Sequence, residues 1–197
     1  MAKSSAPSRE RIVAGAADMI SRRGLSATSI RELAKHAKAP LGSTYHYFPE
    51  GKQQLATEAV RYAGEAVARI VRKELDAGPA AGLRAFLALW RGIVVESDFR
   101  AGCPVLAVSV EEPAADGEIP PSLVAAAEAF ESWEQLLAEA LRKHGAAPDQ
   151  APGLAALIVA SVEGAIAMCR AKRSMQPLDR VAQQLEALIV SALDHPA

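Results

Sequence analysis

The sequence predicts an all-α protein, with a three-helix helix-turn-helix unit followed by a larger helical bundle and about nine helices in all. Half of the 197 residues are hydrophobic but only 5% are aromatic, and this Ala- and Leu-rich composition favours packed helices. Apolar residues recur at offsets of three and four along most of the chain. The one run that is ambiguous between helix and strand is Val105–Val110.

The first helix is expected to begin at Arg9 and to stop at Gly24, which can take the left-handed conformation at a helix end. Ser8 can cap its first turn, and the polar residues 1–8 are expected to form a mobile arm. The apolar face that would pack on the next two helices consists of Ile12, Val13, Ala16, Met19 and Ile20.

Two short helical patterns follow, separated by a break at residues 38–40. Ser29 and Glu32 have the spacing of a capping box for the first pattern. In the second, one stripe carries Leu41, Thr44, Tyr45 and Phe48, while the free face carries Gly42, Ser43, His46 and Tyr47. A free face that is small, hydroxylated and aromatic suits a helix in a groove of DNA, so the pair is a candidate helix-turn-helix.

Proline and glycine delimit the later elements. Pro49 fits an early position of a long helix at about 50–76, which Gly78 and Pro79 end. Further helices are expected at 81–96, 122–144, 151–172 and 178–193, with a short apolar segment at 103–110 and a loop at 112–121. We therefore expect a helix-turn-helix DNA-binding domain at 1–49 and a ligand-binding and dimerisation domain at 50–197.

Charge and motifs narrow the class of protein. Residues 1–60 hold nine Lys or Arg against five Asp or Glu, and residues 61–197 hold thirteen against eighteen. A basic head on an acidic remainder is typical of a nucleic-acid reader joined to a second module. No nucleotide-binding, hydrolase or metal-ligand pattern occurs, so an enzyme, a catalytic site, a metal and a cofactor are not expected.

The N-terminal residues predict a cytoplasmic protein. No apolar run follows the first charges, as a signal peptide would require. The most apolar tract, at 154–168, is interrupted by polar residues and is too short to span a bilayer, so no membrane partner is expected. Cys103 and Cys169 are far apart and form no C-x-x-C pattern, which indicates a reduced pair.

Over residues 9–60 the chain resembles the TetR family of bacterial repressors. The resemblance rests on the first helix and Gly24, the capped second helix, and the run GSTYHYF with a Lys before the next long helix. One extra residue in Pro49-Glu50-Gly51-Lys52, together with the run at 102–105, is similar to the LmrA/YxaF-like subgroup. Two residues depart from the family pattern, because Lys38 stands where a turn Gly is usual and Leu41 where a Lys is usual.

This resemblance and the residue types together imply a DNA site. Hydroxyls, amides and cations would contact phosphates, Gly42 would allow close approach, and Ser43 and His46 would reach base edges. The candidate DNA-binding residues are Thr28, Ser29, Arg31, Gly42, Ser43, Thr44, Tyr45, His46, Tyr47 and Lys52. Lys3 or Arg9 could add contacts from the arm.

Several of these residues have a second interpretation. Tyr45 lies on the apolar stripe and could be core, and a core position is favoured for Thr44. His46 could be solvated, and Arg31 could form a surface ion pair. Phe48 is expected to be core.

The resemblance also implies a homodimer and a pocket for a small-molecule effector, whose apolar walls indicate a hydrophobic or aromatic molecule. The candidate dimer residues are Leu157, Ile158, Val162, Ala165, Val181, Leu185, Leu188 and Ile189, although these faces could instead complete the core of one chain. The candidate pocket residues are Phe86, Trp90, Cys103, Trp133, Met168 and Cys169, all of which could be ordinary core.

The sequence thus predicts a regulator, most simply a repressor, that binds a palindromic double-stranded DNA operator as a dimer and is released by an effector. The charged residues Arg91, Glu163 and Arg170 lie on apolar helices and need a partner or a ligand. Two alternatives stay open: a thiol sensor built on Cys103 and Cys169, and a helical binding protein that no longer binds DNA.

Overall fold

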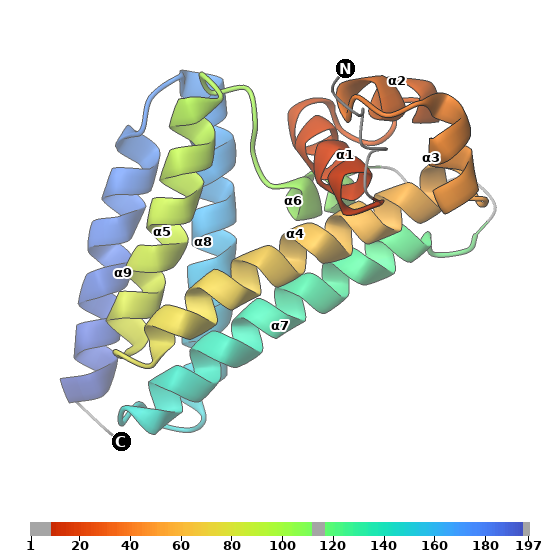
Figure 1. Ribbon diagram of the computed structural model, residues 1–197. Coiled ribbons are helices and arrows are strands. Elements are labelled where there is room, and N and C mark those ends of the chain that lie inside the picture. Colours follow the sequence, from red (N-terminus) through yellow and green to blue (C-terminus); the bar gives the residue numbers. More distant parts are fainter. Residues whose placement is uncertain (1–8, 112–116, 195–197) are drawn as a thin grey trace, which may run out of the picture. The chain divides into compact units, whose positions relative to one another are not determined.

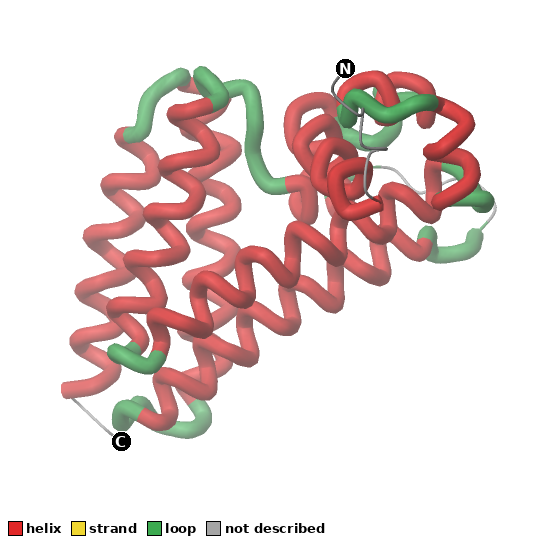
Figure 2. Tube along the Cα trace, viewed as in Figure 1, coloured by secondary structure: helices red, strands yellow, loops and turns green. Residues whose placement is uncertain are grey.

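The computed structural model describes residues 9–111 and 117–194, and every regular element within these ranges is a helix (Figures 1 and 2). The helices are α1 (Arg9–Arg23), α2 (Ile30–His36), α3 (Leu41–Tyr47), α4 (Lys52–Leu75), α5 (Pro79–Glu96), α6 (Pro104–Ser109), α7 (Pro121–Lys143), α8 (Gln150–Lys172) and α9 (Gln176–Asp194). The all-α prediction is confirmed. The expected arm, Lys3, the Ser8 cap and residues 112–116 of the expected loop lie outside the described residues.

One ambiguity about the elements is resolved, and one expectation is wrong. The run at 105–110, which the sequence leaves open between helix and strand, is largely the short helix α6, which Pro104 opens. Pro49 does not belong to the long helix, because Gly51 lies in a tight turn in which its N–H donates to the Phe48 carbonyl (2.9 Å), with a φ of 73°. Helix α4 therefore begins three residues after Pro49, at Lys52.

The chain packs as two compact units that differ from the expected domain division at residues 49 and 50. The first unit comprises residues 1–64 and 104–129, and the second comprises 65–103 and 130–197. The divisions fall inside α4 and α7. The three N-terminal helices thus share one unit with α6 and with the first parts of α4 and α7.

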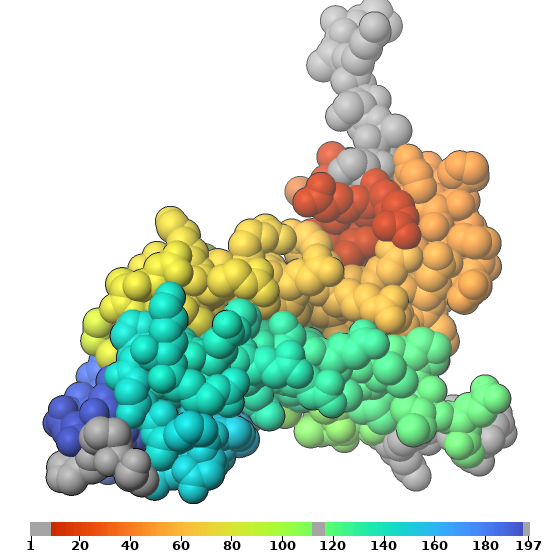
Figure 3. Space-filling view, turned by 90° about the horizontal axis from the view of Figure 1, so that it is seen from below, coloured from red at the N-terminus to blue at the C-terminus, as the bar shows by residue number. Residues whose placement is uncertain are grey.

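In the first unit, α1 packs against α2, α3 and α6. The side chains of Ile12, Ala16 and Ile20 are fully buried, as the apolar face of α1 predicts. Gly24 ends the helix with a φ of 77°. Helices α4 and α7 lie side by side (Figures 1 and 3). Within the first unit, Arg61 of α4 and Glu128 of α7 form a salt bridge of 3.6 Å.

A carboxylate from a distant part of the chain holds the turn between α1 and α2. Glu111, two residues after α6, accepts hydrogen bonds from the N–H of Leu25, the N–H of Ser26 (2.8 Å) and the hydroxyl of Ser26 (2.5 Å). A Cβ added to Gly24 would lie 2.5 Å from the same carboxylate. The α1–α2 turn therefore needs both the glycine and the acid.

In the second unit, α5, α8 and α9 pack together (Figure 1). Salt bridges join Arg91 to Asp179 and Arg84 to Glu186, so α5 and α9 run antiparallel. Helix α8 has the length and apolar composition of a membrane-crossing helix, so the length argument from the sequence does not hold. Its buried face, which includes Ile158, Val162 and Ile166, is instead part of the core of this unit.

Candidate DNA-binding and effector sites

The α2–α3 pair is held by a complete capping box and a strained turn. The Ser29 side chain accepts from the Glu32 N–H (3.2 Å), and the Glu32 carboxylate accepts from the Ser29 N–H (2.9 Å), as the spacing predicts. Lys38 adopts a φ of 52° where the N–H of Ala39 donates to the Ala34 carbonyl (2.9 Å). Lys38 thus takes the left-handed conformation that the glycine usual at this turn position adopts readily.

Helix α3 buries one stripe and leaves the other face open. Phe48 and Thr44 are fully buried, while Gly42 and His46 are exposed and Tyr45 is 49% exposed. The core interpretation of Tyr45 is therefore wrong. The Thr44 hydroxyl donates to the Pro40 carbonyl (3.1 Å), and this bond and its burial remove Thr44 from the candidate DNA contacts.

Ring contacts order the aromatic side chains at the end of α3. The rings of His46 and Tyr47 meet edge to face at 5.6 Å, and those of Tyr47 and Phe48 meet at 6.4 Å. Because Phe48 is buried, this chain of rings anchors the half-buried Tyr47 and the exposed His46. A Cβ at Gly42 would have no atom within 4 Å, so another molecule can approach the backbone there.

Three candidate contacts before α3 have internal partners. Thr28 is 5% exposed and its hydroxyl donates to the Leu25 carbonyl (2.8 Å), so Thr28 is corrected from a phosphate contact to a structural residue. The exposed Ser29 hydroxyl donates to Glu32 (2.7 Å), and this bond is the largest cause of the lowered pKa of Glu32. Arg9 forms a salt bridge with Glu58 (2.5 Å) and stacks on Phe48, which ties it to the first unit.

The candidate cations beside the recognition helix remain available. Arg31 is exposed and forms no salt bridge within the described part of the chain, so the surface ion-pair interpretation is wrong for it. Lys52 is half-buried at the first position of α4, close enough to Glu32 to lower the pKa of that acid slightly. Both flank the exposed face of α3 in sequence.

The expected effector wall is largely a closed core. Phe86, Trp90, Cys103, Trp133 and Cys169 are each at most 3% exposed. Met168 is 47% exposed and is corrected from a pocket residue to a surface residue. Phe86 meets Trp90 and Trp133 edge to face, at 6.3 Å and 5.8 Å. Burial also raises the pKa of the Cys169 thiol, which counts against a reactive thiolate sensor.

Sequence reasoning placed three charged residues on the apolar helices of this unit. Arg91 pairs with Asp179, and Arg170 donates to the Arg100 carbonyl (2.9 Å). Glu163 differs from both, because it is 3% exposed and no nitrogen or oxygen donor among the described residues reaches its carboxylate. Burial raises its pKa to about 8, against a smaller lowering by a hydrogen bond with the Cys103 thiol.

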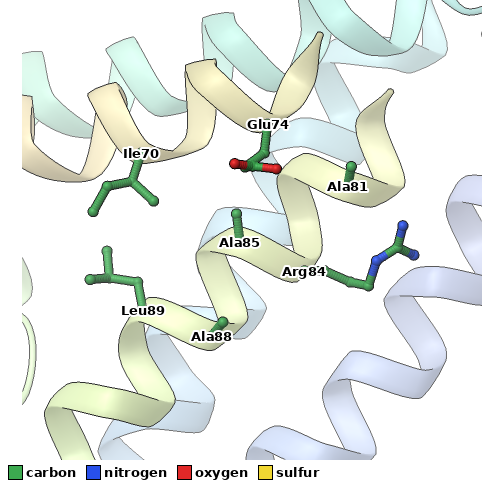
Figure 4. Close-up of a pocket in the computed structure, with 7 residues that line it drawn as sticks. All are labelled: Ile70, Glu74, Ala81, Arg84, Ala85, Ala88 and Leu89. Carbon is green, nitrogen blue, oxygen red and sulfur yellow. The ribbon is translucent and has the colours of Figure 1, made fainter. Parts of the chain in front are cut away.

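The grooves on the surface of the second unit do not involve these core residues. One open groove of about 580 Å³ lies between the end of α4 and α5. Figure 4 shows Ile70 pointing toward Leu89 across it, with Glu74 and Arg84 as its charged side chains. None of the candidate pocket residues lines this groove, so it is distinct from the expected effector site.

The expected dimer surface also needs correction. Five of its eight residues are at most 2% exposed within one chain and cannot meet a partner, namely Ile158, Val162, Ala165, Leu185 and Ile189. Leu157 and Leu188 are 46% and 43% exposed, and Val181 is half-buried. The exposed face of α8 instead carries Gly153, Leu157, Ala160, Gly164, Ala167 and Met168, which we call the α8 stripe.

Of the α8 stripe, sequence reasoning placed only Leu157 at the dimer interface, and it missed Glu111. The spacing of the stripe is visible in the sequence, but α8 has an apolar face on either side and periodicity cannot tell which one is buried. Glu111 carries no sequence signal at all. Its partners in the α1–α2 turn are 85 and 86 residues away.

An exposed recognition helix on a capped, braced helix pair defines a DNA-binding helix-turn-helix protein. Comparison with known families agrees: residues 12–59 match the bacterial regulatory proteins of the tetR family, and residues 79–184 match the C-terminal domain of LmrA/YxaF-like transcriptional regulators. The chain belongs to the TetR family, in its LmrA/YxaF-like group, and is a DNA-binding transcriptional regulator.

Individual relatives cover nearly the whole chain. An HTH-type transcriptional regulator of Mycobacterium tuberculosis is 43% identical over 189 residues, covering 94% of this chain and 95% of the relative. The HTH-type regulator YxaF of Bacillus subtilis is 31% identical, covering 92% and 95%. Among solved structures, the regulatory protein TetR from Rhodobacter sphaeroides has a TM-score of 0.77 at 24% identity, covering 90% and 96%, which supports the fold alone.

Proposed function

We propose that the protein is a cytoplasmic homodimeric repressor that binds a palindromic operator and releases it when a small apolar molecule occupies the second unit. The observation that carries this proposal is that α3 has one buried face and one exposed face. Its buried residues fix the helix to the core, while Gly42 and His46 are exposed and Ser43 and Tyr47 are half-buried. Such a face is chemically suited to a major groove.

The proposed contacts divide into base readers and phosphate binders. Ser43 and His46 would read base edges, and Gly42 would let the helix approach them closely. Tyr45, Tyr47, Arg31 and Lys52 would bind the phosphate backbone on either side. Ser29 would contribute its position at the start of α2 more than its hydroxyl, since that group already donates to Glu32.

A dimer is required because two recognition helices must meet successive major grooves about 34 Å apart. The α8 stripe supports this, since glycine and alanine on one exposed face allow two helices to approach closely. Leu188 on α9 lines a groove of about 400 Å³ with Gly153 and Leu157 of the stripe. We propose this joint surface of α8 and α9 as the subunit interface.

The effector would release the operator because it binds two conformations of the protein with different affinities. An effector that binds more tightly to the conformation with poor operator affinity shifts the population toward that state. By linkage, the operator must weaken effector binding by the same factor. The repressor role therefore predicts mutual antagonism between the two ligands.

Selection of bound sequences from random double-stranded DNA, followed by affinity measurements at several salt concentrations, tests the proposal. We expect a palindrome and a steep salt dependence. Lys52→Ala should weaken binding to all sequences and reduce the salt slope by about one. The matched control is Lys73→Ala, which removes an exposed Lys at the other end of α4 and should leave both quantities unchanged. No enriched sequence would contradict operator binding.

A further inference from the structure

The core of the second unit holds two polar groups that meet no nitrogen or oxygen partner within the described chain. One is the carboxyl group of Glu163 on α8, and the other is the indole N–H of Trp90 on α5. Glu163 is 3% exposed and Trp90 is 1% exposed. Because buried polar groups in folded proteins nearly always have partners, two orphans in one core call for an explanation.

The helix register places these two groups at a similar height. Helices α5 and α8 pack together, and their C-terminal ends meet where Asp98 pairs with Arg173 (2.8 Å). Trp90 lies six residues before Glu96, the last residue of α5, and Glu163 lies nine residues before Lys172, the last residue of α8. At a rise of about 1.5 Å per residue, the two lie roughly 9 Å and 14 Å from these helix ends, a difference of about one helical turn.

An aromatic cluster includes Trp90, and a thiol lies beside the Glu163 carboxyl. Phe86 contacts both Trp90 and Trp133, and Phe130 meets Trp133 edge to face at 5.5 Å. The Cys103 thiol is near enough to the Glu163 carboxyl to affect its pKa. The link between α5 and α6 lies against the end of α8, since Arg170 donates to the Arg100 carbonyl and a Cβ added to Gly102 would lie 3.0 Å from the Arg170 side chain. A buried acid thus belongs to a core rich in aromatic groups.

We propose that Glu163 is the recognition point for the effector of this regulator, and that the effector is an apolar, ring-containing molecule carrying a protonated amine. This inference rests on the proposed function, because it names the chemical class of the molecule that would release the operator. The ammonium group of the effector would donate hydrogen bonds to the Glu163 oxygens. The rings of the effector would pack among Phe86 and Trp133, and an acceptor atom on it could accept a hydrogen bond from the Trp90 N–H.

A cation explains the orphan acid better than a neutral or anionic ligand does. A buried carboxylate is costly unless it is paired, and an ammonium supplies both the opposite charge and N–H donors. Tryptophan and phenylalanine rings add cation–π attraction. A carboxylate ligand would be repelled once Glu163 ionises, and an alcohol would provide only one neutral hydrogen bond.

The closed core also gives such a ligand a means of acting. Since Glu163 and the rings are almost fully buried, a ligand can reach them only in a conformation where the core has opened. A molecule that binds only the opened state shifts the protein toward it. Cys103 directly precedes α6, so occupancy near Glu163 acts on the segment that leads into that helix.

Calorimetric titration of the full chain with matched probes tests the assignment. The probes are the amine, alcohol and carboxylate of three scaffolds, cyclohexylmethyl, benzyl and 2-naphthylmethyl. We expect at least one amine to bind, at least about tenfold more tightly than its alcohol and carboxylate counterparts. Glu163→Gln should remove this preference, and Trp90→Phe should weaken binding while keeping the order of the three.

Glu186→Gln is the control, because it removes an exposed acid of the same unit that pairs with Arg84. It should leave the amine preference intact. The proposal is overturned if no amine binds below about 1 mM, if alcohols or carboxylates bind as well as amines, or if Glu163→Gln retains the preference.

Operator binding, measured in parallel, separates this inference from the proposed function. If the protein binds its selected DNA but the probes show no dependence on Glu163, the effector assignment fails and the regulator stands. If the amines bind through Glu163 but do not weaken operator binding, the site stands and release by this ligand class is wrong.

Discussion

Lys38 adopts a left-handed conformation in the turn between α2 and α3, with its side chain exposed. The conformation costs a non-glycine residue about 1 to 2 kcal/mol, which is partly offset because glycine loses more entropy on folding. We expect Lys38→Gly to stabilise the protein by about 0.5 to 1 kcal/mol in urea unfolding. Lys35→Gly, inside α2, is the control and should destabilise the protein.

Glu163 makes the stability of the protein depend on pH. Its pKa is about 8 in the folded chain, against an ordinary value of 4.5, so the folded state keeps a proton that the unfolded state loses. The contribution of the Glu163 carboxyl to the free energy of unfolding is fully present below pH 4.5 and is lost as the pH rises toward 8.

Glu163→Gln removes this dependence. The stability difference between the variant and the unmodified protein should therefore grow in favour of the variant from pH 5 to pH 9, by roughly 3 to 5 kcal/mol. Urea unfolding at several pH values measures it. A difference that does not change with pH would mean that Glu163 finds a partner in the folded protein.

At the scale of the element, α8 has two apolar faces, and only one of them is buried within the described part of the chain. If the α8 stripe is the proposed subunit interface, Leu157→Glu should convert the dimer into monomers, as measured by light scattering, and abolish operator binding, because a buried charge at the centre of an interface is costly. Ile70→Glu changes an apolar residue that is 39% exposed on α4, outside the stripe, and should leave the dimer intact. A dimeric Leu157→Glu variant would place the interface elsewhere.

Glu111 connects two elements that are distant in sequence. Glu111→Gln weakens three charge-assisted hydrogen bonds to the α1–α2 turn. We expect faster hydrogen exchange at the amides of Leu25 and Ser26, with little change in α5, α8 and α9. Glu128→Gln removes only an exposed ion pair and should leave those amides protected.

The sequence predicts the helices and their ends well, but it does not predict which apolar face of a helix packs inside the chain. The Ser29–Glu32 capping box, the stop at Gly24 and the strained Lys38 were all predictable, because each depends on neighbours within a few residues. The burial of Ile158 and Leu185 against other helices of the same chain was not. That choice depends on which of two apolar faces meets another helix, and no periodicity records it.

At the scale of the whole molecule, the DNA-reading helices belong to a unit that is discontinuous along the chain. The first unit needs residues 104–129 as well as residues 1–64. The predicted boundary at residue 49 follows the recognition motif, whereas packing follows α6 and the first part of α7. Local sequence patterns identify the helix-turn-helix motif, but the folded chain is needed to show that α6 and the first part of α7 pack in the same unit.

This discontinuity has a consequence in time. The turn that Glu111 holds is synthesised 85 residues before the carboxylate itself. At about 5 to 20 residues per second, the ribosome adds that length in roughly 4 to 17 s. During that interval the newly synthesised N-terminal helices expose the surface of α1 that α6 later covers. A chaperone that binds apolar helices therefore has its main opportunity to bind this surface before the first unit is complete.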